Sequence, residues 1–415
     1  MDVILHCDAN SFYASCEVVQ RPELQGLPVS VGGDQEARHG IVLASTVEAK
    51  KYGVKTGMAL WQARELCPRL IILKPDFRLY MEMSRRLRQM YQEYSPRVES
   101  YGLDECWLDL SEPGMTMTEG KHVADTLRER AKDELGLCLS VGVSFNKIFS
   151  KLGSDYQKPD ATTVITQDNY KSIVWPLPVS DLMFVGPRTT LKLRQKMINT
   201  IGDLAATDAN LLRGWFGKVG VMHYANANGL DRSPVMETGF ESAIKSIGNS
   251  TTTPIDMLTC EDVKCVITLL SESVSTRLRE AGLQGRCISL YLRDTDLKTV
   301  GCQITINHDT ALCDDICKIA MDLFTHRGYQ AMLPLRSAGV SVSTLRSTMT
   351  AVQLDLFGMT IRRDKLEHVE RAVDDIRRRY GMQSVLRGNV MAQRAFSKIN
   401  PYNDHVIHPV PWYAG

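Results

Sequence analysis

The spacing of apolar residues predicts alternating strands and helices over the first third of the chain. Short apolar runs are typical of buried strands, and apolar residues three and four positions apart are typical of helices. An alternating stretch at 97–110 has Asp104 and Glu105 at its centre, which predicts a hairpin with the acidic pair at its turn. The other predicted elements are strands at 3–7, 29–31 and 138–143 and helices at 11–19, 59–66, 79–94 and 119–135. The order βαββαβ within this region indicates a ferredoxin-like α+β domain.

The pattern changes twice further along the chain. Residues 182–204 predict short helices around the turn Val185-Gly186-Pro187-Arg188. A stretch rich in Ser, Thr and Gly at about 238–254 predicts a linker. The elements expected beyond it are a helix at 260–281, strands at 287–293, 300–306 and 337–343, a helix at 310–327 and a charged helix near 363–380.

Composition places the chain among globular proteins of more than one domain. At 415 residues it is too long for one core, and its 44% hydrophobic and 23% charged residues are ordinary. No apolar run approaches the ~20 residues that cross a bilayer, and the first residues lack the pattern of an export signal. Eleven scattered cysteines without a C-x-x-C pair indicate reduced thiols. We therefore expect a cytoplasmic protein with no membrane partner.

The net charge of +1 conceals an uneven distribution. Residues 1–184 carry 21 Lys and Arg against 25 Asp and Glu, whereas residues 185–240 carry 7 against 4 and residues 359–415 carry 10 against 6. Basic segments beside an acidic body suit a polyanionic partner, because Lys and Arg replace the counterions of phosphates. Charged runs are more often solvated faces, so this signal is weak by itself.

Three carboxylates form the main candidate site. Asp8 follows the first strand and Asp104-Glu105 lies at the hairpin turn, so the three meet if these strands are neighbours in one sheet. Crowded carboxylates repel unless a divalent cation neutralises them, and oxygen ligands without His or Cys favour magnesium. Two ions ~4 Å apart would hold the attacking and leaving oxygens of a phosphoryl transfer. The alternative, a helix cap at Asp8 and a solvated turn, has similar weight on these residues alone.

Several motifs, in order, resemble the Y-family of translesion DNA polymerases, of the bacterial polymerase IV and polymerase V catalytic type. The segment HCDANSFYASCE at 6–17 resembles the family's opening motif, and YGLDECWLD at 101–109 resembles its second acidic motif. The similarity continues through Val141-Gly142-Val143-Ser144, Asn146-Lys147 and Lys158-Pro159.

The resemblance implies a right-hand polymerase of α+β multidomain class. Its expected parts are a ferredoxin-like palm at 1–30 and 75–170, small fingers at 31–74, a helical helix-hairpin-helix thumb at 171–238, a C-terminal α/β little finger at 239–350, and a clamp-binding motif with a basic helical tail at 351–415. The implied activity is error-prone, template-directed DNA synthesis past lesions, in DNA repair and the SOS damage response, with a mutator effect. Implied partners are primer-template DNA, deoxynucleoside triphosphates and a sliding clamp.

The resemblance also implies roles for individual residues. Asp8, Asp104, Glu105 and the backbone carbonyl of Ala9 would bind two magnesium ions. Phe12 and Tyr13 match aromatic residues of the nucleotide pocket. Tyr13 falls on the steric-gate position that rejects a 2′-hydroxyl, and core packing is the alternative for Phe12. Lys50 and Lys158 match residues that reach the triphosphate, where cations stabilise developing charge. Solvated surface is the alternative for both lysines.

Four positions depart from the family pattern. Lys50 stands where many relatives carry arginine, which keeps the charge but loses the bidentate fork. Ala44 and Val47 replace a hydroxyl residue and a tyrosine that touch the phosphates. The polymerase V type also tends to lack these two, which favours that branch. Gly102 replaces a serine and loosens the turn, so we expect slower turnover that Gly102→Ser would raise in single-turnover extension.

The remaining candidates concern DNA and protein partners. Gly186, Arg188 and Lys192 read as a helix-hairpin-helix that holds DNA phosphates, with an ordinary helical turn as the alternative. The unit at 245–345, with the order strand, helix, strand, strand, helix, strand, resembles the little finger, and its candidate backbone contacts are Arg277, Arg279, Arg293, Arg336 and Arg346.

The end of the chain carries a second motif. Gln353, Leu354, Leu356 and Phe357 resemble a clamp-docking peptide, with a buried strand as the alternative. The helix beyond it, with Arg377-Arg378-Arg379, has no role that the sequence defines. DNA, a recombinase or another accessory damage-response protein is a candidate partner for it.

Two other functions compete with an active polymerase. A catalytically impaired, clamp-bound scaffold would explain Ala44, Val47 and Gly102, but all three acidic positions are filled. A nucleotide cyclase shares paired carboxylates and the palm layout, but it needs neither the helix-hairpin-helix nor the last domain. Primer extension on an abasic template with magnesium separates the three functions.

Overall fold

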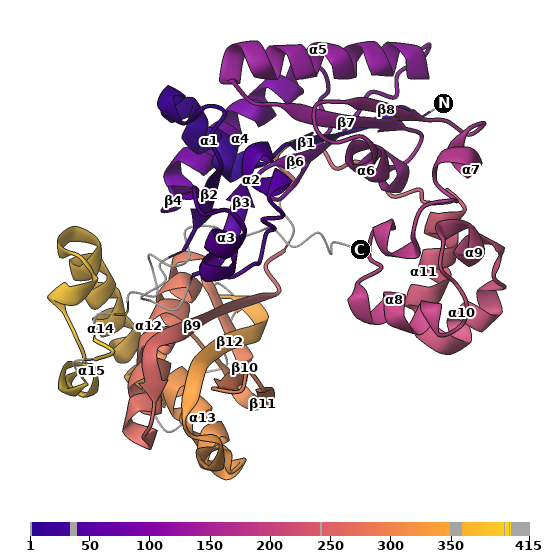
Figure 1. Ribbon diagram of the computed structural model, residues 1–415. Coiled ribbons are helices and arrows are strands. Elements are labelled where there is room, and N and C mark those ends of the chain that lie inside the picture. The colour runs from indigo at the N-terminus through magenta and orange to yellow at the C-terminus, as the bar shows by residue number, and fades with distance from the viewer. Residues whose placement is uncertain are drawn as a thin grey trace. The chain divides into compact units, whose positions relative to one another are not determined.

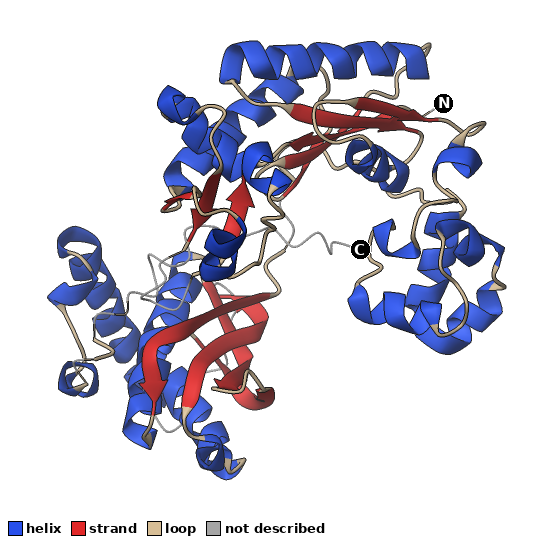
Figure 2. Ribbon diagram, viewed as in Figure 1, coloured by secondary structure: helices blue, strands red, loops and turns tan. Residues whose placement is uncertain are grey.

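The computed structural model describes residues 2–33, 40–240, 243–348, 359–393, 395–397 and 399. It divides into two compact units, of which unit 1 consists mainly of Met1–Gly33 and Ile41–Ser242 and unit 2 mainly of Ala243–His408 (Figure 1). Both mix helices and strands (Figure 2). Within the described residues, no helix is both long enough and apolar enough to cross a membrane.

A five-stranded sheet forms the centre of unit 1. Its order is β5-β6-β1-β7-β8, so the first strand of the chain lies in the middle. The strands are β1 (Ile4–Ala9), β5 (Val98–Tyr101), β6 (Glu105–Asp109), β7 (Leu139–Ser144) and β8 (Thr162–Ile165). β1 runs antiparallel to both β6 and β7. The predicted hairpin is confirmed as β5 and β6, and its turn contains Asp104, whereas Glu105, also predicted at the turn, is the first residue of β6.

Helices cover both faces of this sheet. Figure 1 shows α5 (Met117–Leu135) above it and α6 (Lys147–Tyr156) below it. Because side chains alternate along a strand, Leu5 and Cys7 enter the core formed with α5, α1 (Phe12–Gln20) and α4 (Phe77–Gln92), while the residues between them face α6. The fold therefore gives β1 one apolar face and one polar face.

Gly142 in β7 allows α6 to approach the sheet closely. A Cβ added there would lie 1.9 Å from the carbonyl oxygen of Ser150 and 2.5 Å from the amide nitrogen of Ser154, both backbone atoms of α6. Gly142→Ala should therefore destabilise unit 1 by about 1–3 kcal/mol, because the helix has to move. Urea denaturation of both proteins measures this. Gly186→Ala, at a glycine with open space around its Cβ position, is the matched control. Equal stability of wild type and Gly142→Ala would contradict the expectation.

Two smaller substructures complete unit 1. A three-stranded sheet, in the order β3-β2-β4, packs with α2 and α3 around its own small core. Its elements are β2 (Val29–Gly32), β3 (Val42–Ser45), α2 (Val47–Lys51), α3 (Leu60–Leu66) and β4 (Ile71–Leu73). A helical substructure packs against Ile148, Phe149 and Leu152 of α6. Its helices are α7 (Tyr170–Ile173), α8 (Pro187–Arg194), α9 (Ile201–Ala206), α10 (Ala209–Phe216) and α11 (Lys218–Ala227).

Unit 2 is a four-stranded antiparallel sheet with helices on it. The strand order is β11-β10-β12-β9, and α12 and α13 pack on the sheet around a common core. The elements are β9 (Ser246–Met257), α12 (Cys260–Glu280), β10 (Leu283–Asp294), β11 (Thr299–Thr310), α13 (Cys313–His326) and β12 (Leu335–Ser347).

The linker predicted at about 238–254 is partly wrong, because Ser246–Met257 forms strand β9. Its polar composition hides a strand whose hydroxyl and amide side chains alternate in burial, so that Asn249, Thr251 and Thr253 lie inside. Asn249 Nδ2 donates to Ser273 Oγ at 2.8 Å and Thr253 Oγ1 donates to the Arg336 carbonyl at 3.1 Å. Hydrogen bonds to α12 and β12 thus satisfy these buried polar side chains. The strand therefore lacks much of the apolar alternation from which strands are predicted.

Helices also follow β12. The charged helix predicted near 363–380 is present as α14 (Met359–Tyr380), followed by α15 (Gly388–Ala392). Val390 and Phe396 enter the core of unit 2, so this extension is part of the unit. The predicted clamp motif, Gln353 to Phe357, lies outside the described residues.

Candidate active site

Asp8 and Glu105 lie opposite each other on the paired strands β1 and β6. His6 and Asp8 share the face of β1 that is turned toward α6, since Leu5 and Cys7 occupy the core face. His6 Nδ1 lies 2.8 Å from Ser154 Oγ on α6, and its Nε2 lies 3.3 Å from Glu105 Oε2. The two carboxylates therefore occupy the buried, polar side of the sheet, beside α6.

Asp104 joins them from the turn between β5 and β6. Its carbonyl accepts a hydrogen bond from the amide of Ala9 at 2.9 Å, which ties the turn to the end of β1. Burial, and after it the charges of Glu105 and Asp8, raise the pKa of Asp104 to about 7. Burial is also the main cause that raises the pKa of Asp8. The structure thus brings together the three predicted carboxylates from two distant segments.

Two lysines lie against these carboxylates. Lys158 Nζ is 2.7 Å from Asp8 Oδ2, and Lys151 Nζ is 2.9 Å from Glu105 Oε2 and 3.6 Å from Asp8 Oδ2. Asp155 links the lysines at 2.6 Å from Lys158 and 3.3 Å from Lys151. Burial alone would lower the pKa of Lys158, but Asp8 and Asp155 hold it above its usual value.

The donor set suits a hard divalent cation, although its side chains face lysines. Within the described ranges, no three His, Cys, Asp or Glu side chains are grouped as ligands of a metal ion. The oxygen atoms are nevertheless of the kind magnesium prefers. Burial, and after it repulsion by Glu105 and Asp8, raises the pKa of Asp104, and a divalent cation would offset both effects.

Tyr13 is held in a stack of aromatic rings beside the site. Its ring is parallel to that of Tyr80, with centroids 4.4 Å apart and 15° between the planes, and the edge of Phe77 meets it at 6.0 Å. Tyr80 Oη donates to Glu17 Oε1 at 2.6 Å, which fixes the supporting ring. Asp104 contributes, after burial, to raising the pKa of Tyr13, so the tyrosine lies near the acidic cluster.

Phe12 lies in the core of unit 1. Its side chain is 2% exposed, and its ring packs against Tyr13 and Tyr80 with centroids 5.8 and 6.5 Å away. This burial favours the core-packing alternative for the ring, which here supports Tyr13. The expected part of Phe12 in the nucleotide pocket stays a prediction.

Lys50 approaches the same region from α2. Its Nζ donates to Ser11 Oγ at 2.8 Å. The pKa of Lys50 is lowered, first by partial burial and then by the charge of Lys158. The two lysines that are predicted to bind the triphosphate are therefore close enough for their charges to interact. Lys50 also lies within the field of Asp8, which Lys151 and Lys158 contact directly.

Of the other departures, only Gly102 has a left-handed backbone conformation. Its φ is +83°, in the region that glycine favours, and a Cβ there would meet Asp104 Oδ1 at 3.6 Å. A serine at this place is expected to cost about 1–2 kcal/mol of backbone strain. The faster turnover expected of Gly102→Ser stays a prediction. Val47 is 37% exposed and Ala44 is partly buried against the core.

Several residues of the matched motifs hold the framework. Lys147 is 2% exposed, bonds both carboxyl oxygens of Glu99 at 2.7 Å and lies over the ring of Trp107. Asn146 caps α6 by accepting from the Phe149 amide and donates to the Gly229 carbonyl. These contacts fix α6, and with it Lys151.

Sequence reading missed His6, Lys151, Asp155 and Tyr80 as neighbours of the site. Lys151 lies one helical turn beyond the motif residue Lys147, on α6, where no helix is predicted from the sequence. His6 neighbours the site because its side chain is on the face of β1 turned toward α6, and Tyr80 because its ring stacks on Tyr13 of α1. The sequence alone defines neither the strand pairing nor the helix packing that brings them there.

The predicted DNA-binding residues are dispersed over both units. Gly186 caps α8, and Arg188 and Lys192 of that helix are exposed. In unit 2, Arg277 donates to the Gly248 carbonyl at 2.9 Å. Arg279 is 8% exposed and paired with Glu370 and Asp374, so its assignment as a DNA contact is wrong. Among the described residues, Arg293, Arg336 and Arg346 keep that assignment as a prediction.

Comparisons with known proteins agree with this architecture. The impB/mucB/samB family model matches residues 7–155, and the model of the family's C-terminal domain matches residues 244–356. The DNA polymerase IV of Acetivibrio thermocellus is 45% identical over 96% of this chain and 99% of its own. That of Pelotomaculum thermopropionicum is 41% identical over 92% of this chain and 94% of its own.

Solved structures match the fold. A Y-family DNA polymerase chimera, Dbh-Dpo4(243-245)-Dbh, has a TM-score of 0.74 at 21% identity, covering 82% of this chain and 98% of the other. The predicted α+β multidomain polymerase fold is confirmed by this likeness. The relatives carry the name polymerase IV, so the inclination toward the polymerase V branch drawn from Ala44 and Val47 is wrong. The chain belongs to the impB/mucB/samB family, the Y-family of translesion DNA polymerases, and is a DNA-directed DNA polymerase.

Proposed function

We propose that this polymerase extends primers past template lesions with low fidelity, by two-metal-ion phosphoryl transfer at Asp8, Asp104 and Glu105. The observation that carries the proposal is the meeting of these carboxylates at the end of β1 and the β5–β6 turn, with the pKa of Asp104 raised to about 7. Magnesium ions bound there would neutralise the carboxylates and the developing charge of the leaving group. The carbonyl of Ala9 is a further proposed ligand.

The chain's own residues would bind and orient the nucleotide. Lys50 and Lys158 would exchange their contacts with Ser11 and Asp8 for the oxygens of the triphosphate, since each Nζ already lies 2.7–2.8 Å from an oxygen at the site. Tyr13, fixed by Tyr80, would press on the sugar and exclude a 2′-hydroxyl. Lys151 is left to balance the charge of Glu105 when Lys158 turns to the phosphates.

The domain roles follow from the resemblance. The sheet of β1 and β5–β8 would be the palm (1–30 and 75–170), and the small sheet of β2–β4 the fingers (31–74). The helices α8–α11 would be the thumb (171–238), gripping DNA phosphates at Gly186, Arg188 and Lys192. Unit 2 would contain the little finger (239–350). Gln353, Leu354, Leu356 and Phe357 are proposed to bind the sliding clamp, which would raise the local concentration of the enzyme at primer ends. We propose a cytoplasmic role in the damage response.

Primer extension tests the proposal. A primer annealed to a template with an abasic site should be extended past the lesion with magnesium and deoxynucleotides. A damage-tolerance scaffold, the second candidate because of Ala44, Val47 and Gly102, would bind the primer-template but leave it unextended. Extension of undamaged templates that stops at the abasic site would exclude lesion bypass while leaving the polymerase activity intact.

Magnesium should stabilise the chain more at pH 8 than at pH 6. The pKa of Asp104 is raised to about 7, so ionising this carboxyl costs folded-state stability as pH rises from its ordinary range to about 7. A bound cation offsets that cost only where the carboxyl is ionised. Magnesium affinity should fall by up to about tenfold per pH unit below 7. Thermal melts with and without magnesium measure the shift in Tm at each pH. Equal shifts at pH 6 and pH 8 would contradict the assignment.

A further inference from the structure

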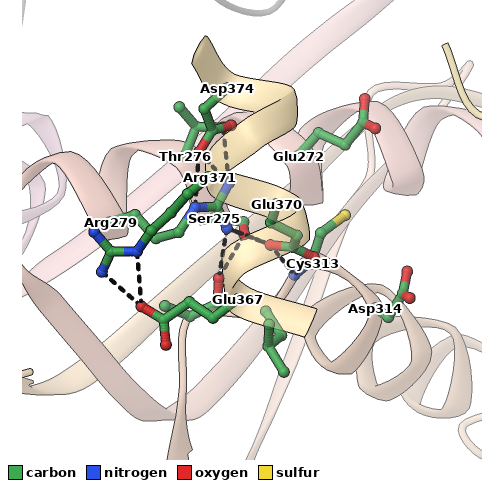
Figure 3. A network of polar contacts seen from close by, with 12 residues as sticks. Glu272, Ser275, Thr276, Arg279, Cys313, Asp314, Glu367, Glu370, Arg371 and Asp374 are labelled. Carbon is green, nitrogen blue, oxygen red and sulfur yellow. Dashed lines mark hydrogen bonds and ion pairs between the residues drawn. The ribbon is translucent and has the colours of Figure 1, made fainter. Parts of the chain in front are cut away.

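Helix α14 is attached to unit 2 through its charged side chains. Arg279 of α12 pairs with Glu370, and its Nη2 lies 2.7 Å from Asp374 Oδ2 (Figure 3). One turn further along, Arg377 Nη2 lies 2.9 Å from Glu272 Oε1. The residues Glu272, Arg279 and Arg377 are all at most 8% exposed. The polar face of this amphipathic helix is therefore the buried one.

The apolar residues of α14 consequently lie at the surface. Leu366 is 40%, Val369 60%, Ile376 41% and Tyr380 75% exposed, and Val373 is half-buried. These five follow one another at alternating intervals of three and four residues, which is the spacing of a coiled-coil seam. None of the five belongs to the apolar core of unit 2 or borders it, in the part of the chain that is described. Surface helices normally bury their apolar stripe, so the exposed apolar stripe of α14 indicates a surface that binds a partner.

The charged residues beside the stripe indicate which charge a partner helix should carry. Lys365 and Arg379 each precede a stripe residue by one position and are exposed. Neither forms an ion pair among the residues that the structure describes. The opposite flank of the stripe is the face occupied by α12. Asp375 also precedes a stripe residue, but its carboxylate is paired with Arg378 at 3.1 Å. The charges that α14 leaves unpaired for an incoming helix at these positions are therefore those of Lys365 and Arg379.

A second copy of this chain is a poor occupant. An antiparallel pair of α14 helices would set Lys365 of one copy beside Arg379 of the other, and like charges at such flanking positions oppose pairing. A parallel pair would require Glu370 as the partner of these cations, but Glu370 is committed to Arg279.

We propose that the exposed stripe of α14 docks an amphipathic helix of another protein, one with an apolar seam and acidic flanking residues. The ion pairs with α12 hold α14 so that the stripe faces outward, and Lys365 and Arg379 select against basic partners. This surface lies in unit 2 and does not depend on the chemistry proposed for unit 1.

Synthetic peptides of three heptads test the proposal with the full-length protein. One peptide carries leucine at the seam and glutamate at the flanks, and the other carries lysine at the flanks. Fluorescence anisotropy measures the Kd of each. We expect the glutamate peptide to bind at least about tenfold more tightly than the lysine peptide. The double variant Val369→Ser/Ile376→Ser should lose at least about tenfold in affinity. Lys365→Glu/Arg379→Glu should reverse the preference.

A matched control is Leu258→Ser, which removes another exposed apolar side chain of unit 2, 66% exposed, and should bind as wild type does. Primer extension by each variant should equal that of wild type, which shows that the chain is folded. Binding of neither peptide, equal binding of both, or unchanged binding by the double variant would overturn the proposal. A dimer in sedimentation that the double variant dissociates would also overturn it, by showing a second copy on the stripe.

Discussion

Asp104→Asn should lower the rate of nucleotide incorporation by about three orders of magnitude, because the loss of a proposed metal ligand would remove several kcal/mol of transition-state stabilisation. The same substitution should leave the metal-free protein at least as stable at pH 8 as wild type. Asp104 is buried and repelled by Glu105 and Asp8, which raises its pKa to about 7, so its ionised form is costly at pH 8. Single-turnover extension and thermal melts measure the two effects.

The opposite signs of these effects separate chemistry from folding. Asp133→Asn changes the same group on the exposed side of α5 and should alter neither rate nor stability. An Asp104→Asn enzyme that incorporates nucleotides at the wild-type rate would remove the basis of the proposed mechanism. A slow enzyme that is also much less stable would mean that Asp104 acts through the fold of the β5–β6 turn.

Tyr13→Ala should weaken discrimination against ribonucleotides by roughly 10- to 200-fold, the range that a small steric difference in a pocket supplies. The ring of Tyr13 lies 4.4 Å from that of Tyr80 and 6.0 Å from that of Phe77, so its position is held on two sides, as the proposed gate requires. Incorporation of deoxynucleotides should change less, because they have no group at that place. The ratio of kcat/KM for a deoxynucleotide and its ribonucleotide measures the effect.

Two conservative variants sharpen this test. Tyr13→Phe keeps the ring and should discriminate as wild type does. Tyr80→Phe removes the hydroxyl that bonds Glu17 at 2.6 Å but keeps the stacked surface, so the discrimination should also survive. A Tyr13→Ala enzyme with unchanged discrimination would exclude Tyr13 as the gate.

The sequence was sufficient for the elements that follow simple periodicity. The strand at 3–7, the hairpin around Asp104 and the helices predicted at 260–281 and 310–327 appear within a few residues of the predicted bounds, whereas α15 has no predicted counterpart. The resemblance implies a strand at the start of the unit at 245–345, but the apolar pattern does not show β9, because its buried residues include Asn249, Thr251 and Thr253. Asn249 and Thr253 are satisfied by partners far along the chain. Polar burial of this kind leaves no periodic apolar signal, so only the assembled fold reveals it.

The candidate site also contains some residues that the sequence predicts and others that only the fold reveals. The carboxylates could be predicted, since their motifs lie at strand ends and turns that a sheet must bring together. Phe12 and Tyr13 are neighbours in the sequence, and only the direction of α1 decides that the first enters the core while the second faces the acidic cluster. Arg279 likewise looks like any surface arginine until Glu370 and Asp374 of α14 cover it.

Gly142, which has no side chain, links the stability of unit 1 to the charge balance of the candidate site. The gap it leaves lets α6 rest directly on β7, and that separation sets how far the ammonium group of Lys151 reaches toward Asp8 and Glu105. A methyl group at this point would push the helix outward, and the lysine with it. A substitution at position 142 would therefore change both the charge balance among the carboxylates and the thermal stability of unit 1. Neither property can be changed there without the other.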